Sequence, residues 1–192
     1  MPMKVKIVDW TEVERWSSSL SRSIVESGYA PDAIIAVARG GLVPARLLAD
    51  MLSVKDVLSI RIEHWNETAK PEEKAVVKEP LRANLSGKKI LIVDDIADTG
   101  ESLMLAKENV SSCNPKEAKT AAFQFIGKTS RFKPDFIAEQ LSEWIWYMYP
   151  WNYHEDVKNL VGRIKKPGDT EASIMEKFIA EYGARIPIDF KL

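Results

Sequence analysis

Three aspartates and a short hydroxyl- and glycine-containing turn follow an apolar run in the middle of the chain. In order, the segment is Ile90, Leu91, Ile92, Val93, Asp94, Asp95, Ile96, Ala97, Asp98, Thr99, Gly100, Glu101 and Ser102. Backbone N–H groups at the start of a helix bind phosphate, and paired carboxylates bind sugar hydroxyls or a hard cation such as Mg²⁺. The pattern therefore predicts a site for a phosphorylated sugar, with Asp98 left for proton chemistry.

A second candidate anion site lies earlier in the chain, after a short apolar stretch at residues 33–37. It consists of Ala38, Arg39 and Gly40. Glycine lets the backbone approach an anion closely, and an arginine side chain can hold that anion with two parallel hydrogen bonds. The alternative is a turn that only connects a strand to a helix, with Arg39 in solvent.

Residues 90–102 resemble the signature of the type I phosphoribosyltransferases, which bind 5-phosphoribosyl-1-pyrophosphate (PRPP). The Arg-Gly-Gly-Leu-Val-Pro string at residues 39–44 is similar to the pyrophosphate loop of bacterial and archaeal purine phosphoribosyltransferases. A receiver-type domain would place its acidic pair near the first strand, and a P-loop would end in Gly-Lys-Ser or Gly-Lys-Thr. Neither alternative fits this chain as well.

The resemblance implies a role for each residue of the two loops. Asp94 and Asp95 would hold the ribose hydroxyls and Mg²⁺, directly or through water, and Asp98 would be the general acid or base near N7 of the base. The 5-phosphate would be bound by Thr99, Gly100, Glu101 and Ser102, with the Glu101 side chain turned away. Pyrophosphate would be bound by Ala38, Arg39 and Gly40, with the Ala38–Arg39 peptide expected to be cis.

Base recognition is expected from the last third of the region that resembles the family. Lys128 and Lys133 resemble family positions where a lysine meets the exocyclic oxygen of a 6-oxopurine, and only one of them need do so. Trp146 falls where relatives place a stacking ring, and Tyr147 would offer backbone groups. Alternating aromatic residues in a strand are also typical of a core or a dimer interface. Relatives often have an acid after Pro-Trp where this chain has Asn152, which leaves the preferred base open.

Apolar strands alternate with amphipathic helices along most of the chain. Thr11 and Glu14 form a candidate capping box for a first helix. Residues 33–37, 57–62, 90–93 and 118–126 are predicted strands. Residues 63–78 are predicted to be a mobile loop or a loose hairpin. This order predicts an α/β fold with a doubly wound, mainly parallel sheet.

The family resemblance adds two features to this fold: a small hood and a C-terminal helical extension. We expect a phosphoribosyltransferase domain at residues 1–151, including the base-binding hood, and the extension at residues 152–192. The extension could cap the base pocket, extend a dimer interface or add stability.

Composition limits the class of partner. The 192 residues carry 27 basic and 28 acidic side chains, a net charge of -1 that favours neither nucleic acid nor a membrane surface. Cys113 is the only cysteine, which excludes an internal disulfide and fits a reducing compartment. No apolar run approaches the roughly 20 residues of a membrane helix. A cytoplasmic protein is predicted.

The resemblance implies a purine phosphoribosyltransferase that joins a purine base, favouring a 6-oxopurine, to PRPP and releases a nucleoside monophosphate and pyrophosphate. It also implies a homodimer. An adenine phosphoribosyltransferase on the same frame remains an alternative because of Asn152. The other alternative is a non-catalytic regulator that senses PRPP or a nucleotide, although the chain has no added helix-turn-helix pattern or basic face.

Overall fold

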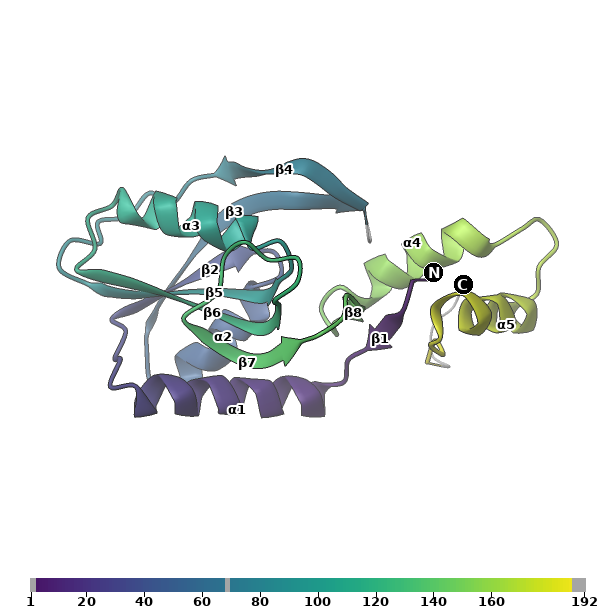
Figure 1. The fold of residues 1–192 in the computed structure, drawn as a ribbon, viewed down its shortest axis with the longest axis horizontal. Helices are drawn as coiled ribbons and strands as arrows, with labels where there is room; N and C mark the ends of the chain where they lie inside the picture. The colour runs from purple at the N-terminus through teal and green to yellow at the C-terminus, as the bar shows by residue number, and fades with distance from the viewer. Residues whose placement is uncertain (1–2, 68–69, 188–192) are drawn as a thin grey trace.

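The computed structural model describes residues 3–67 and 70–187, with the side chains of residues 64–73 excepted. The described residues include a central sheet of six strands in the order β4-β3-β2-β5-β6-β7 (Figure 1). These strands are β2 (Ala33–Ala38), β3 (Asp56–Glu67), β4 (Lys70–Glu79), β5 (Lys89–Ala97), β6 (Glu117–Ile126) and β7 (Phe136–Leu141). Every neighbouring pair is parallel except the antiparallel pair β3–β4. The predicted mainly parallel α/β sheet is confirmed.

The order of the strands reverses between β2 and β5. From β2 the chain passes through α2 (Leu42–Met51) to β3 on one side, and from β5 it passes through α3 (Glu101–Ser111) to β6 on the other. In Figure 1, α3 lies on one face of the sheet and α1 (Trp10–Glu26) and α2 lie on the opposite face. The loops after β2 and β5 therefore diverge, which opens a crevice at the carboxyl ends of these two strands.

The apolar run in β5 is buried on both faces of the sheet. Leu91 and Val93 belong to the cluster that faces α1 and α2, whereas Ile90 and Ile92 belong to the cluster that faces α3. Because both sets of side chains must be apolar, the strand does not alternate in the way that a half-exposed strand would.

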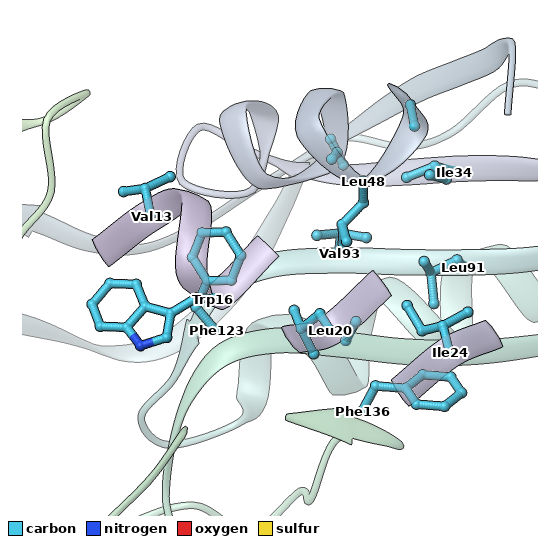
Figure 2. Packing of buried hydrophobic residues seen from close by; sticks show 14 of the residues in the cluster. Val13, Trp16, Leu20, Ile24, Ile34, Leu48, Leu91, Val93, Phe123 and Phe136 are labelled. Atoms are coloured by element: carbon cyan, nitrogen blue, oxygen red, sulfur yellow. The ribbon is translucent and has the colours of Figure 1, made fainter. Parts of the chain in front are cut away.

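Helix α1 covers the first of these faces with one apolar stripe. Trp16, Leu20 and Ile24 point toward residues of the sheet such as Leu91 and Phe123 (Figure 2). Their spacing of four residues places them on the same side of the helix.

The predicted capping box at the start of α1 was wrong. The helix begins at Trp10, and Asp9 caps it by accepting a hydrogen bond from Glu12 N at 2.8 Å. Both Asp9–Glu12 and Thr11–Glu14 have the spacing of a capping box, so spacing alone does not choose between them.

The polar segment after the third strand forms a hairpin, which was one of the two predicted alternatives. Strands β3 and β4 pair in an antiparallel arrangement, with register shifts between Arg61 and Ile62 and again between Glu63 and Trp65. A twisted hairpin therefore extends beyond the end of β2 on the cavity side of the sheet.

A smaller unit lies beyond the sheet, on the right in Figure 1. It contains the parallel strands β1 (Val5–Ile7) and β8 (Trp146–Met148) and the helices α4 (Tyr153–Ile164) and α5 (Glu171–Tyr182). Their apolar side chains share a third cluster that includes Met148, Leu160 and Phe178. The division between a domain at 1–151 and an extension at 152–192 stays a prediction. Within the described ranges, none of the helices has the length and apolar character needed to span a membrane.

Candidate functional site

A cavity of about 620 Å³ opens at the carboxyl ends of β2 and β5. Both predicted loops contribute to its wall. The predicted site residues that line it are Ala38, Arg39, Gly40, Asp94, Asp95, Asp98, Thr99, Gly100 and Ser102. Residues 56 positions apart in the sequence thus face one volume, because the two parallel strands that carry them are neighbours.

Asp94 and Asp95 lie at the floor of the cavity, where β5 leaves the core. Asp94 Oδ1 accepts a hydrogen bond from Asp95 N at 3.0 Å, and Asp95 Oδ2 accepts one from Trp151 Nε1 at 3.1 Å. Burial, reinforced by the adjacent charge of Asp95, raises the pKa of Asp94 well above its ordinary value. Burial also raises the pKa of Asp95, although the hydrogen bond from Trp151 opposes that rise. Two crowded carboxylates favour a ligand that brings hydroxyl donors or a cation.

The turn between β5 and α3 places backbone N–H groups at the start of the helix, where Glu101 N donates to Thr99 Oγ1 at 3.3 Å. Gly100 is the N-cap residue, at φ 80°, and it has no side chain that could cap the helix. A Cβ at this position would lie 2.5 Å from Ser130 Oγ, so both the backbone angle and the space favour glycine. Glu101 Oε2 accepts a hydrogen bond from Ala75 N of β4 at 3.1 Å, so this carboxylate is directed to the hairpin. The turn can therefore present N–H groups and hydroxyls to an anion.

The loop after β2 brings a cation to the other end of the cavity. The Ala38–Arg39 peptide is cis, as the resemblance implied. A Cβ on Gly40 would lie 2.5 Å from Asp95 Oδ2, so the two loops approach closely here. Arg39 Nη2 donates to both carboxylate oxygens of Glu155 on α4, at 3.1 and 2.8 Å. Arg39 thus lines the cavity while its guanidinium is paired with α4.

Asp98 is half-buried at the rim of the cavity, and its two carboxylate oxygens have separate donors. Thr129 Oγ1 donates to Oδ1 at 2.8 Å, and Trp144 Nε1 donates to Oδ2 at 2.9 Å. Neither donor was identified from the sequence. Thr129 lies next to the predicted Lys128, and Trp144 lies in the predicted aromatic segment, but the pairing with Asp98 has no sequence signal.

The residues predicted to bind the base lie outside the wall of the cavity. Lys128 and Lys133 are both exposed. Trp146 packs against the third apolar cluster, and Tyr147 is buried in the first, where its ring is 6.2 Å from that of Trp16. These four residues do not line the cavity, and their role in base binding stays a prediction.

The cavity is also lined by side chains that were not among the predicted site residues, among them Trp151, Arg61 and Asn152. Trp151 stacks on Tyr149 with ring centroids 4.7 Å apart. Arg61 lies beside Ala38 in the register of β2 and β3 and donates to Glu63 at 2.6 Å. Asn152 follows Trp151 on the same wall. The Pro-Trp pair could have identified Trp151, whereas Arg61 depends on a strand register that the sequence does not state.

The fold and the two loops that line its cavity define a protein class, and the comparison with known families agrees. Residues 6–157 match the family described as the phosphoribosyl transferase domain. The chain belongs to this family.

The chain is also similar to individual members of the family. It is 30% identical over 147 residues to the xanthine-guanine phosphoribosyltransferase of Idiomarina loihiensis, which covers 77% of this chain and 86% of that protein. It is 29% identical over 164 residues to the enzyme of the same name from Nitratidesulfovibrio vulgaris, over 85% of this chain and 93% of that one. Among solved structures, the purine phosphoribosyltransferase of Pyrococcus horikoshii is 30% identical, with a TM-score of 0.66, and covers 78% of this chain and 95% of that one.

Proposed function

We propose that the protein transfers the phosphoribosyl group of PRPP to N9 of a purine base, with release of pyrophosphate, in purine salvage. The observation that carries this proposal is the single cavity that the Arg39 loop, the two aspartates and the α3 turn share. PRPP has anions at two ends of a ribose, and the cavity has a candidate anion site on either side of a carboxylate pair. The xanthine-guanine and purine enzymes to which the chain is similar support a 6-oxopurine as the acceptor.

The roles within the cavity follow from the charge of each group. The turn from Thr99 to Ser102 would bind the 5-phosphate, because α3 begins there and Glu101 is directed away. Asp94 and Asp95 would accept hydrogen bonds from the ribose hydroxyls. Ala38, Arg39 and Gly40 would bind pyrophosphate, for which Arg39 must exchange Glu155 for the ligand.

The donor set fits a magnesium ion that is shared with the substrate. The described residues contain no group of three or more His, Cys, Asp or Glu side chains that could hold a metal by themselves. Mg²⁺ commonly binds through one or two carboxylates together with substrate phosphates, and Asp94 and Asp95 offer such a pair. When bound, the ion would neutralise the charge that develops on the leaving pyrophosphate. The protein's own contribution is to hold the ribose and the base in line for displacement.

Asp98 is the residue that we assign to proton transfer at the base. It lies at the rim of the cavity, and a carboxylate there can accept or return a proton near N7 as the bond to N9 forms. The base itself would stack on an aromatic ring of the 144–151 segment, with Trp146 and Tyr147 as the predicted contacts and Lys128 or Lys133 as the donor to O6. A lysine donates but does not accept, which disfavours a 6-amino group.

A competition assay tests the proposal. The purified protein would be incubated with PRPP, Mg²⁺ and an equal mixture of adenine, hypoxanthine, guanine and xanthine, and the nucleotides would be separated by chromatography. We expect the 6-oxopurine nucleotides together with pyrophosphate. Adenosine monophosphate as the main product would instead support the adenine enzyme, which Asn152 on the cavity wall keeps as an alternative. PRPP binding without pyrophosphate release for every base would point to a regulator.

Assembly is a separate expectation. A homodimer is implied by the family resemblance, and light scattering of the purified protein would test it.

A further inference from the structure

The carboxylate of Asp98 is fixed by donors from two different loops. Thr129 lies in the turn after β6, and Trp144 lies between β7 and β8. Their hydrogen bonds to Oδ1 and Oδ2 are 2.8 and 2.9 Å long. One donor on each oxygen determines the plane of the carboxylate as well as its position.

The first donor is held in place by the backbone of its own loop. Strands β5 and β6 are paired up to Ala97 and Phe125, so the turns that follow them emerge side by side. Arg131 N donates to Thr99 O at 2.9 Å, and Thr129 Oγ1 also lies 3.0 Å from Asp98 O. The hydroxyl of Thr129 is therefore placed by the contact between the two turns and does not depend on a long flexible side chain.

The second donor is held by packing. Trp144 is half-buried against the first apolar cluster, and its ring centroid lies 6.3 Å from that of Trp146. An indole has one N–H and no acceptor on its ring, so it can only donate. Trp144 therefore stabilises Asp98 as a hydrogen-bond acceptor without competing for the proton that Asp98 would exchange.

We infer that Trp144 and Thr129 are positioning residues that aim the Asp98 carboxylate at the purine, an inference that rests on the proposed function. A carboxylate has about four lone-pair sites, of which these donors occupy two. The other two remain for the base. Because a misplacement of about 1 Å can reduce a rate about 100-fold, releasing either donor should slow the chemical step more than it weakens binding.

The test compares Trp144→Phe and Thr129→Val with wild type, each also combined with Asp98→Ala. Initial rates would be measured with hypoxanthine, guanine and xanthine at saturating PRPP and Mg²⁺. We expect each single variant to lose about tenfold or more in kcat, with the KM for PRPP unchanged, whereas neither substitution lowers kcat further in the Asp98→Ala background. Thr129→Ser keeps the hydroxyl and should retain most of the wild-type kcat.

A matched control lies within β6, outside the lining of the cavity. Thr120 Oγ1 donates to Asp135 Oδ2 at 2.8 Å, the same length as the bond from Thr129 to Asp98. Thr120→Val should lower the melting temperature but leave kcat unchanged. This control separates the loss of a threonine–aspartate hydrogen bond from the loss of the one that positions Asp98.

Two results would overturn the inference while leaving the proposed function intact: a kcat within twofold of wild type for both folded variants, or an equal loss of kcat with and without Asp98. The second result would mean that the two residues act on the base directly. A wild-type protein without transfer to any base would overturn the proposed function, and this inference with it.

Discussion

Replacing Gly41 with alanine tests how tightly the two loops of the site are packed. Gly41 precedes α2, and a Cβ at this position would lie 2.2 Å from Val93 O and 2.8 Å from Val37 O. Both contacts are with backbone atoms of the adjacent central strands β5 and β2. Gly41 N also donates to Val37 O at 2.8 Å, so the glycine cannot move outward without losing this bond.

The size of the effect follows from these distances. Side-chain Cβ atoms essentially never approach other heavy atoms more closely than 3.0 Å, so the contact at 2.2 Å requires a shift of about 0.8 Å. Overpacking of an interior costs about 1–3 kcal/mol, and a rigid backbone neighbour places this case near the upper limit. A loss of about 3 kcal/mol would lower the melting temperature of a chain of this size by about 6–12 °C.

The assay is thermal unfolding followed by circular dichroism, together with PRPP titration. Gly162→Ala is the matched control, because Gly162 lies inside α4 and a Cβ there would meet nothing within 4 Å. This control should gain about 1 kcal/mol in the free energy of unfolding. Gly41→Ala should also weaken PRPP binding, since any shift of Val93 moves Asp94. A melting temperature within about 2 °C of wild type would refute the steric reasoning.

Three further outcomes are expected. The pKa of Asp94 is higher in the folded protein than in the unfolded chain. The proton on Asp94 therefore stabilises the fold fully at a pH below the unfolded-state pKa, and this stabilisation is lost as the pH rises through the folded-state pKa. Asp94→Asn should therefore stabilise the ligand-free protein at pH 7, by about 0.5–2 kcal/mol, but not near pH 4, and denaturant titrations at both pH values would check this. Arg39→Ala should weaken pyrophosphate and PRPP binding together, as measured by calorimetry, and intact affinities would contradict the assignment. Glu155→Gln should strengthen pyrophosphate binding by up to about fivefold with little change in stability, because the side chains of the Arg39–Glu155 pair are 76% and 48% exposed; weaker binding would contradict competition between Glu155 and the ligand.

Local patterns predicted the elements that surround the cavity. The strand at 90–93, the turn at 98–102 and the helix after it follow one another in the sequence. Their apolar spacing and turn residues therefore predict them without knowledge of any long-range contact. The boundaries were less accurate: β5 continues through both aspartates to Ala97, and the N-cap of α1 is Asp9, two residues before the predicted cap Thr11. Strand β5 continues beyond its apolar run because it stays paired with β6 up to Ala97, and the residues of β5 alone do not indicate this extension.

The aromatic segment shows why base recognition was harder to predict. Five of the eight residues at 144–151 are aromatic, and counting back from Pro150 selects Trp146. In the structure, Trp146 pairs with Val5 of β1 and packs against the third cluster, whereas Trp144 contacts Asp98 and Trp151 contacts Asp95. Strand β8 comprises only Trp146–Met148, so strand alternation does not place Trp144 and Trp151, which precede and follow it. Their positions depend on the path of the chain on either side of β8, and no local spacing states that path.

The sequence alone determined that a Thr-Gly turn, a carboxylate pair and an arginine loop exist and that parallel strands carry them, because each is encoded by adjacent residues. The tertiary structure decided which side chains meet. Arg39 and Glu155 are 116 residues apart, and Asp98 and Trp144 are 46 apart. Such contacts depend on the order of the strands, on the packing of α4 against β1 and β8, and on which side chains the whole fold buries. None of these can be read from a short stretch of sequence.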